Sequence, residues 1–139
     1  MALMPRKVKY RKSQKMKNRG IATRGEHLIF GEYGLKAIEN GLVRANQLEA
    51  CRLLIARKMR GAGKLWIGAF PATPVTKKPA ETRMGKGKGD LDHWVCKIKR
   101  GKMILEVGGV PGEFAKQICR MAAFKLPVRS RFVTRAVVH

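Results

Sequence analysis

The amino-acid sequence predicts a single domain of mixed helix and strand content, preceded by a basic arm and interrupted by one long loop. The chain has 139 residues and is 45% hydrophobic, which is enough for one core. Apolar residues recur at helical spacing in two segments and form short strand-like runs elsewhere. Residues 1–25 contain no acidic residue. We therefore assign 1–25 to the arm and 26–139 to the domain, with an exposed loop at about 71–92.

The domain is expected to begin with two short strands. Apolar runs at 28–30 and 35–38 are separated by Gly31 and Gly34, and the dipeptide Asn40-Gly41 closes the second run. This pattern is typical of strands joined by turns.

A helix is predicted to follow from Asn46. Asn46 can cap the first turn, Glu49 stands three residues later as in a capping box, and the glycines around Ala62 supply a stop. The apolar stripe of this helix is Leu48, Cys51, Ile55 and Met59.

The second half of the domain is predicted to contain more strands. A strand-like run covers 64–70, and three prolines then interrupt regular structure and favour the exposed loop at 71–92. The runs 93–99 and 103–107, joined by a turn at 100–102, indicate a hairpin.

The chain is expected to end with a helix and a strand. The helix spans 111–126 and is stopped by Pro127, and its packing face is Phe114, Ile118, Met121, Ala122 and Lys125. A last strand covers 128–138, where Arg129, Arg131 and Arg135 fall on one face.

The charge balance predicts a polyanionic partner. Thirty-one Lys and Arg against nine Asp and Glu give a formal net charge of +22. Nucleic acid is the first candidate, because phosphate contacts release condensed counterions, and an anionic membrane surface is the second. The cations expected to bind nucleic acid are Arg6, Lys7, Lys9, Arg11, Lys12, Lys15, Lys17, Arg19 and Arg24 in the arm, with Arg52 and Lys64 in the domain.

The segment 83–89, Arg-Met-Gly-Lys-Gly-Lys-Gly, is the most informative stretch of the chain. Alternate glycines allow positive φ and close approach to a partner, and the lysines between them supply ammonium groups on long stems. We expect an exposed cationic finger formed by Lys77, Lys78, Arg83, Met84, Gly85, Lys86, Gly87, Lys88 and Gly89.

The sequence gives little support for an enzyme. No Gly-Lys-Ser/Thr completes a Walker A loop, and Asp90 stands where a dinucleotide fingerprint needs glycine. His93 lies beside Asp90 and Asp92 at a loop end, where such neighbours are more often solvated than catalytic. We predict no enzymatic activity, no small-molecule substrate and no cofactor.

The remaining chemistry-bearing residues are assigned structural roles. Three widely spaced cysteines, Cys51, Cys96 and Cys119, fit reduced core thiols better than zinc ligands or disulfides. Phe30, Trp66, Phe70 and Trp94 lie in apolar runs and are expected in the core rather than stacked on bases. No apolar run is long enough to span a bilayer, so we expect a soluble intracellular protein.

Several motifs together resemble one family. In order they are 4–12, 30–37, 47–50, 63–67, 74–79, 83–89 and 125–128, with Phe-Gly-Glu-Tyr-Gly-Leu-Lys-Ala at 30–37 and Pro-Val-Thr-Lys-Lys-Pro at 74–79. The chain resembles the L-sixteen family of bacterial and organellar large-subunit ribosomal proteins from about residue 4 to residue 133. It departs from the usual pattern at Gly68, often arginine in the family, and around 72–73 and 108–112.

The resemblance implies a fold, partners and a location. It implies an α+β domain whose mostly antiparallel sheet carries two helices. The arm and domain cations named above would bind large-subunit rRNA, and the 83–89 loop would contact tRNA near the aminoacyl-tRNA site and the peptidyl-transferase centre. Neighbouring ribosomal proteins would be further partners. The location would be the cytoplasmic large ribosomal subunit, or alternatively a mitochondrial or chloroplast ribosome.

Two other classes of function stay open from the residues alone. A membrane-active basic protein would need a helix with a contiguous apolar face and a basic opposite face. A phosphate-handling enzyme would use the glycine loop and lose turnover when Lys86 or Lys88 is replaced.

Overall fold

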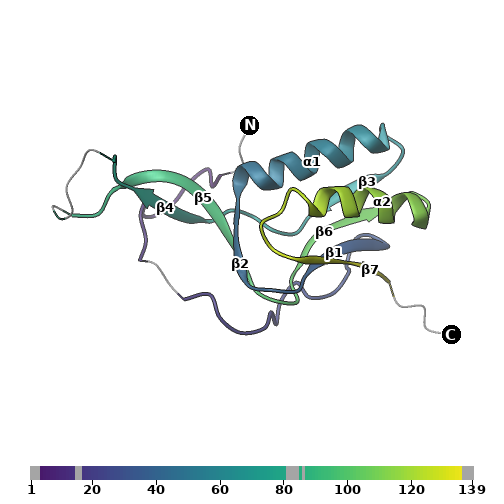
Figure 1. The fold of residues 1–139 in the computed structure, drawn as a ribbon, viewed down its shortest axis with the longest axis horizontal. Helices are drawn as coiled ribbons and strands as arrows, with labels where there is room; N and C mark the ends of the chain where they lie inside the picture. Colours follow the sequence, from purple (N-terminus) through teal and green to yellow (C-terminus); the bar gives the residue numbers. More distant parts are fainter. Residues whose placement is uncertain (1–3, 15–16, 81–84, 86, 136–139) are drawn as a thin grey trace.

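The computed structural model describes residues 4–14, 17–80, 85 and 87–135, which form an α+β fold (Figure 1). The elements are β1 (Tyr33–Ala37), β2 (Gly41–Arg44), α1 (Ala45–Met59), β3 (Lys64–Ile67), β4 (Thr73–Lys77), β5 (Asp90–Ile98), β6 (Met103–Gly108), α2 (Gly112–Ala123) and β7 (Ser130–Thr134). Among these residues the strands make two antiparallel sheets, ordered β3-β6-β1-β7 and β2-β5-β4. The predicted class and the two helices are confirmed.

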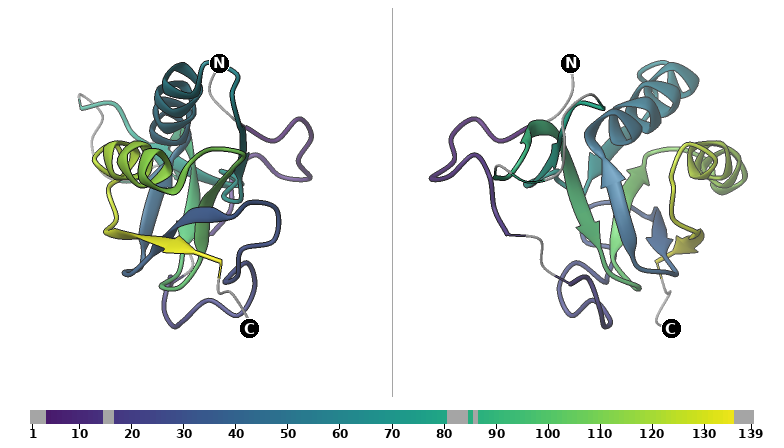
Figure 2. Two further views of the ribbon diagram at one scale, coloured as in Figure 1. Left: turned by 90° about the vertical axis from the view of Figure 1, so that its right-hand side faces the viewer. Right: turned by 60° about the vertical axis from the view of Figure 1, so that its left-hand side comes forward.

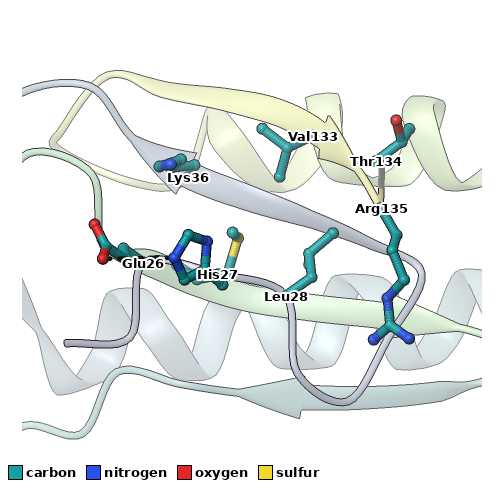
Figure 3. A pocket seen from close by; sticks show the side chains of 8 residues that line it. Glu26, His27, Leu28, Lys36, Val133, Thr134 and Arg135 are labelled. Atoms are coloured by element: carbon teal, nitrogen blue, oxygen red, sulfur yellow. Dashed lines mark ion pairs between the residues drawn. The ribbon is translucent and has the colours of Figure 1, made fainter. Parts of the chain in front are cut away.

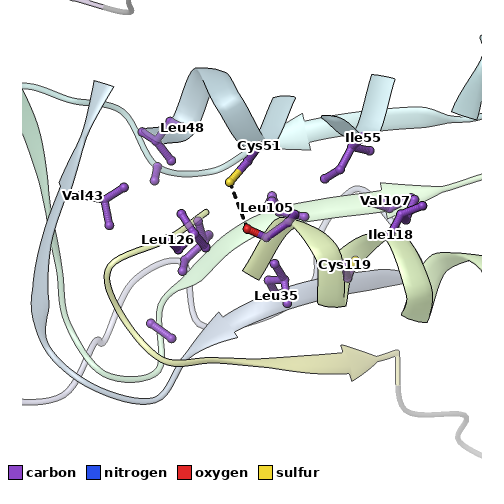
Figure 4. Packing of buried hydrophobic residues seen from close by; sticks show 14 of the residues in the cluster. Leu35, Val43, Leu48, Cys51, Ile55, Leu105, Val107, Ile118, Cys119 and Leu126 are labelled. Carbon is purple, nitrogen blue, oxygen red and sulfur yellow. Dashed lines mark hydrogen bonds between the residues drawn. The ribbon is translucent and has the colours of Figure 1, made fainter. Parts of the chain in front are cut away.

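The core lies between the two helices and the four-stranded sheet. Both helices cover the same face of this sheet and lie side by side (Figure 2). Leu48 and Ile55 of α1 and Ile118 of α2 meet Leu35 and Leu105 of the sheet, and all five are almost fully buried (Figure 4). Burying a side chain of this size stabilises the fold by about 1.5–3 kcal/mol, so this layer is the main source of stability.

Helix α1 begins before the predicted cap. Its N-cap is Arg44, whose N–H donates to Oε1 of Gln47 at 2.8 Å, and its C-cap is Arg60, which has the left-handed conformation. The predicted cap at Asn46 is wrong because β2 runs directly into the helix and fixes its first turn earlier. The predicted apolar stripe is confirmed, since Leu48, Cys51, Ile55 and Met59 are all buried.

The strands before α1 differ from the prediction. Residues 28–30 are not a strand, because the amides of Ile29 and Phe30 donate to the carboxylate of Glu106 at 2.6 and 3.2 Å instead of to a neighbouring strand. The strand predicted at 35–38 is present as β1, shifted two residues toward the amino terminus at its start. Strand β2 was missed, since Asn40-Gly41 reads as a turn although Gly41 already pairs with Ile98.

Strand β4 lies inside the segment for which an irregular loop is predicted. It pairs with the amino-terminal half of β5 and includes Pro74. A proline lacks the N–H of a ladder, and it is tolerated here because β4 is an edge strand. The prolines therefore do not exclude regular structure, and the connection between β4 and β5 is residues 78–89.

The predicted hairpin at 93–107 is wrong, although both of its strands exist. Strand β5 belongs to the three-stranded sheet and β6 to the four-stranded sheet. The turn between them passes the end of β1, where the N–H of Gly101 donates to the carbonyl oxygen of Ala37 at 2.8 Å. Gly101 has φ +97°, which suits glycine at this change of direction.

The last helix and strand are shorter than predicted. Helix α2 ends at Ala123, and its buried face is Ala115, Ile118, Cys119 and Ala122. Met121 is exposed and Phe114 only half-buried, because the small residues allow closer contact and set the packing face. Strand β7 is confirmed over Ser130–Thr134, while residues 136–138 of the predicted strand lie outside the described residues.

The aromatic residues divide between core and surface. Trp94 is buried as predicted, and Trp66 is half-buried. Phe30 and Phe70 are 63% and 49% exposed, so their assignment to the core is wrong. The three cysteines are buried free thiols, as predicted.

Candidate nucleic-acid interface

The hairpin formed by β4 and β5 extends away from the helices. Strand β5 pairs with β2 through Val95–Ile98 and with β4 through its amino-terminal half. Its amino-terminal half and β4 therefore continue beyond the part of the sheet that α1 covers (Figure 1). This arrangement places the described residues of the connection between β4 and β5 at the end of the molecule farthest from β3.

The β4–β5 loop (78–89) has the backbone that its glycines predict. Gly85 and Gly87 have φ +103° and +93°, and both are exposed. The Nζ of Lys78 donates to the carbonyl oxygen of Gly85, a contact between the two sides of the loop. Arg83, Met84 and Lys86 of the predicted finger lie outside the described residues.

The basic arm lies beside this loop. The Nζ of Lys88 donates to the carbonyl oxygen of Ser13, and the Nζ of Lys12 is 3.9 Å from Oδ1 of Asp90. Two basic segments that are distant in the sequence therefore meet at one end of the molecule. The predicted arm cations within the described residues are all exposed: Arg6, Lys7, Lys9, Arg11, Lys12, Lys17, Arg19 and Arg24.

Hydrogen bonds join the end of the arm to the three-stranded sheet. The side-chain Nδ2 of Asn18 donates to the carbonyl oxygens of Gly41 and Ile98 at 3.1 and 3.0 Å. The N–H of Ala22 donates to the carbonyl oxygen of Arg100 at 2.9 Å. Sequence reasoning missed Asn18, because a polar residue in a basic segment gives no signal of a long-range contact.

The two predicted cations outside the arm are in other places. Arg52 forms an ion pair with Glu49 on α1, and this hydrogen bond lowers the pKa of the Glu49 carboxyl. Lys64 is exposed at the start of β3, and strand β3 lies far from the β4–β5 hairpin (Figure 1). Neither residue joins the cluster of arm and loop cations, and Arg52 already has an acidic partner.

Asp90, Asp92 and His93 do not form a catalytic site in which two carboxylates orient a histidine base. Nδ1 of His93 lies 2.6 Å from Oδ2 of Asp92, and the hydrogen bond lowers the pKa of that carboxyl. Asp90 instead faces Lys12 of the arm.

The pocket in Figure 3, of about 390 Å³, lies between the segment around His27 and strands β1, β6 and β7. Glu26 and His27 lie at the end next to Lys36, and Arg135 lies at the other end. The Glu26 carboxylate and the His27 imidazole come from adjacent residues, and Oε1 of Glu26 lies 3.5 Å from Nε2 of His27. The other side chains that line the pocket do not converge on this pair. This geometry gives no oriented catalytic group.

A basic projection with an adjacent basic arm is typical of proteins that bind nucleic acid. Residues 5–133 match the family described as Ribosomal protein L16p/L10e. Two relatives, both called large ribosomal subunit protein uL16 and both from strains of Leptospira biflexa serovar Patoc, are 49% identical over 136 residues, covering 98% of this chain and 99% of each relative. The chain therefore belongs to this ribosomal protein family, as its motifs indicate. None of the helices in the described residues is long and apolar enough to cross a membrane.

Proposed function

We propose that this protein is a structural constituent of the large ribosomal subunit. Its arm binds large-subunit rRNA, and its β4–β5 loop contacts tRNA near the aminoacyl-tRNA site and the peptidyl-transferase centre. Neighbouring ribosomal proteins are further partners. The protein contributes no catalytic group, because peptide-bond formation belongs to rRNA. Family membership and the names of the relatives support the assignment to the large subunit.

The contact between arm and loop is the observation that best supports the RNA-binding roles. Lys88 reaches Ser13, so the loop and the part of the arm around Lys12 and Ser13 present their cations at one end of the molecule. The two carboxylates described there both have partners, since Lys12 lies beside Asp90 and His93 lies beside Asp92. A partner at this end therefore meets a strongly positive surface, which favours phosphate groups.

The loop geometry fits a site between two RNA surfaces. Gly85 and Gly87 have positive φ and no side chain, and nothing lies within 4 Å of where a Cβ would stand at either position. Such a backbone can approach RNA closely while the neighbouring lysines offset phosphate repulsion.

Salt dependence of RNA binding tests the proposal. The affinity of the full chain for a large-subunit rRNA fragment should fall by about 10³–10⁵ between about 50 and 200 mM salt, if about six to ten phosphates are neutralised. An affinity that does not change over this range would contradict the proposal.

Sedimentation tests the assignment to the large subunit. In a sucrose gradient at high salt, the protein should sediment with the large subunit. A pool that stays entirely at the top would contradict stable incorporation. Gradients from cytoplasmic and organellar fractions distinguish a bacterial-type cytoplasmic ribosome, the expected location, from that of a mitochondrion or chloroplast.

The packing of the helices disfavours a membrane-active function. The apolar faces of α1 and α2, centred on Ile55 and Ile118, are buried against each other and the sheet. The two helices of the described residues therefore present no large apolar face to a bilayer. Liposome flotation without RNA should leave the protein in the soluble fraction. Nucleotide turnover, which an enzyme using the loop lysines would need, should be undetectable.

A further inference from the structure

Phe30 is exposed although it is a large apolar residue. One face of its ring stacks on Trp66, with centroids 6.0 Å apart and planes inclined by 19°. The side chain is nevertheless 63% exposed, so its other face is open to solvent. Trp66 belongs to β3, and this strand lies at the opposite end of the molecule from the β4–β5 hairpin.

The backbone that holds Phe30 is fixed from two sides. The buried carboxylate of Glu106 accepts the amides of Ile29 and Phe30 at 2.6 and 3.2 Å. On the other side, Nη2 of Arg135 donates to the carbonyl oxygens of Ile29 and Gly31, both at 3.1 Å. The exposed ring is thus preorganised, which lowers the entropy cost of binding a partner.

A groove of about 340 Å³ runs beside the aromatic pair. Its walls are largely glycine, and a Cβ at Gly108 would stand 3.2 Å from the Trp66 ring, so the indole lies directly against the backbone. The charged residues that line the groove are Lys64 and Glu32. Lys64 is exposed at one edge, where it can reach a group bound beside Phe30.

We propose that the free face of Phe30 stacks on an unpaired RNA base, and that Lys64 contacts a phosphate next to that base. This inference rests on the proposed function and adds a second RNA contact, distant from the arm and loop. Charge favours RNA over an apolar protein segment, because Lys64 lines the same groove as Phe30, Arg135 hydrogen-bonds the carbonyl oxygens of the residues on either side of Phe30, and the chain has a net charge of +22. Bases of every type present a π face, so the contact requires no particular sequence.

Two probes of equal charge isolate the stacking contact. They are a short oligoadenylate and an abasic oligonucleotide of the same length, measured with the full chain at one salt concentration. Wild-type protein should bind oligoadenylate more tightly. Phe30→Leu should weaken oligoadenylate binding by about 5- to 150-fold, the equivalent of about 1–3 kcal/mol, and leave abasic binding unchanged.

Two further variants act as controls. Phe30→Tyr retains an aromatic face and should keep wild-type affinity. Phe70→Leu changes another exposed aromatic residue, in the segment between β3 and β4, and should have no effect. If Phe30→Leu does not fold, the fluorescence of a 2-aminopurine oligonucleotide bound to the wild-type protein is measured instead. Stacking of the base on Phe30 should quench this fluorescence, and unquenched fluorescence would contradict the stacking contact.

Several outcomes would overturn the inference. Equal wild-type affinity for the two probes, or unchanged binding by Phe30→Leu, would show that no base stacks there. If Phe30→Leu binds the rRNA fragment normally but enters the large subunit poorly, the surface around Phe30 and Trp66 contacts a protein partner instead. In each case salt-dependent binding of the rRNA fragment would persist. Loss of that binding in the wild-type protein would instead contradict the proposed function.

Discussion

The helix-covered sheet and the β4–β5 projection differ in how many of their side chains are buried. In the first, Leu35, Ile55, Leu105 and Ile118 are almost fully buried in one continuous core. In the second, β4 is half-buried at most and the loop at its end is largely exposed in the described residues. The first region gains its free energy from apolar burial, whereas the second displays backbone and cations.

This difference indicates that the helix-covered sheet stabilises the fold, whereas the projection is available to bind a partner. A projection with few buried side chains can tolerate changes of sequence without loss of the fold, because little of the free energy of folding depends on it. Its lysines can therefore be chosen for a partner. Substitutions in the helix-covered sheet should therefore change stability, whereas substitutions in the projection should change RNA binding.

A cavity in the core should give the largest effect. Ile55→Ala removes a fully buried side chain between α1 and the sheet and should lower the free energy of unfolding by about 2–5 kcal/mol. Thr76→Ala in β4 is the control in the projection and should cost less than about 1 kcal/mol. Urea denaturation measures both. Equal losses would contradict the division between the regions.

A substitution at Glu106, whose carboxylate is buried, tests how much the other face of the sheet contributes to stability. Glu106→Ala leaves the amides of Ile29 and Phe30 without their acceptor, which should cost about 1–3 kcal/mol. Glu39→Ala is the matched control, because Oε1 of Glu39 accepts an amide from Arg129 at 2.9 Å on the exposed surface, where water can replace it. Thermal unfolding should separate the two variants, and similar stabilities would argue against burial as the cause.

The core thiols should give a smaller, pH-dependent effect. Burial raises the pKa of Cys51 from 9.0 to about 11 and that of Cys119 from 9.0 to about 12. Above pH 9 the unfolded thiols ionise while the native ones keep their protons, so the free energy of unfolding should fall as pH rises from about 9 toward 11–12.

Alkylation provides the direct measurement of these thiols. Native protein at mildly alkaline pH should react with iodoacetamide far more slowly than urea-unfolded protein, because the native thiols are protonated and inaccessible. Reaction of the native protein at the rate of a free thiol would place the cysteines outside the core.

Periodicity predicted the elements better than it predicted their partners. The stripe of Leu48, Cys51, Ile55 and Met59 identified α1 because a buried helical face repeats its spacing. The same logic assigned β5 and β6 to a hairpin, since nothing local shows that the turn at Gly101 leads to another sheet. Likewise, the amides of Ile29 and Phe30 donate to Glu106, a residue more than seventy positions away, so no local pattern could exclude a strand there.

The candidate interface was predictable in composition but not in arrangement. The cations of the arm and the glycines of the loop are visible as residue types, and positive φ at Gly85 and Gly87 follows from glycine itself. The contact between Lys88 and Ser13 depends on the fold, as does the exposure of Phe30. An apolar run predicts burial on average and gives no warning of the residue that remains outside.

The β4–β5 projection is proposed to bind RNA without supporting the fold, and a double substitution tests this separation. Lys86 and Lys88 are changed to alanine, and Lys58 and Lys116, exposed on the two helices, are changed as the control. Both proteins should unfold at the wild-type urea concentration and enter the large subunit. Only the loop variant should weaken tRNA binding to that subunit, with a salt slope reduced by about two. Unchanged tRNA affinity in the loop variant, or an equal loss in the control, would contradict the account.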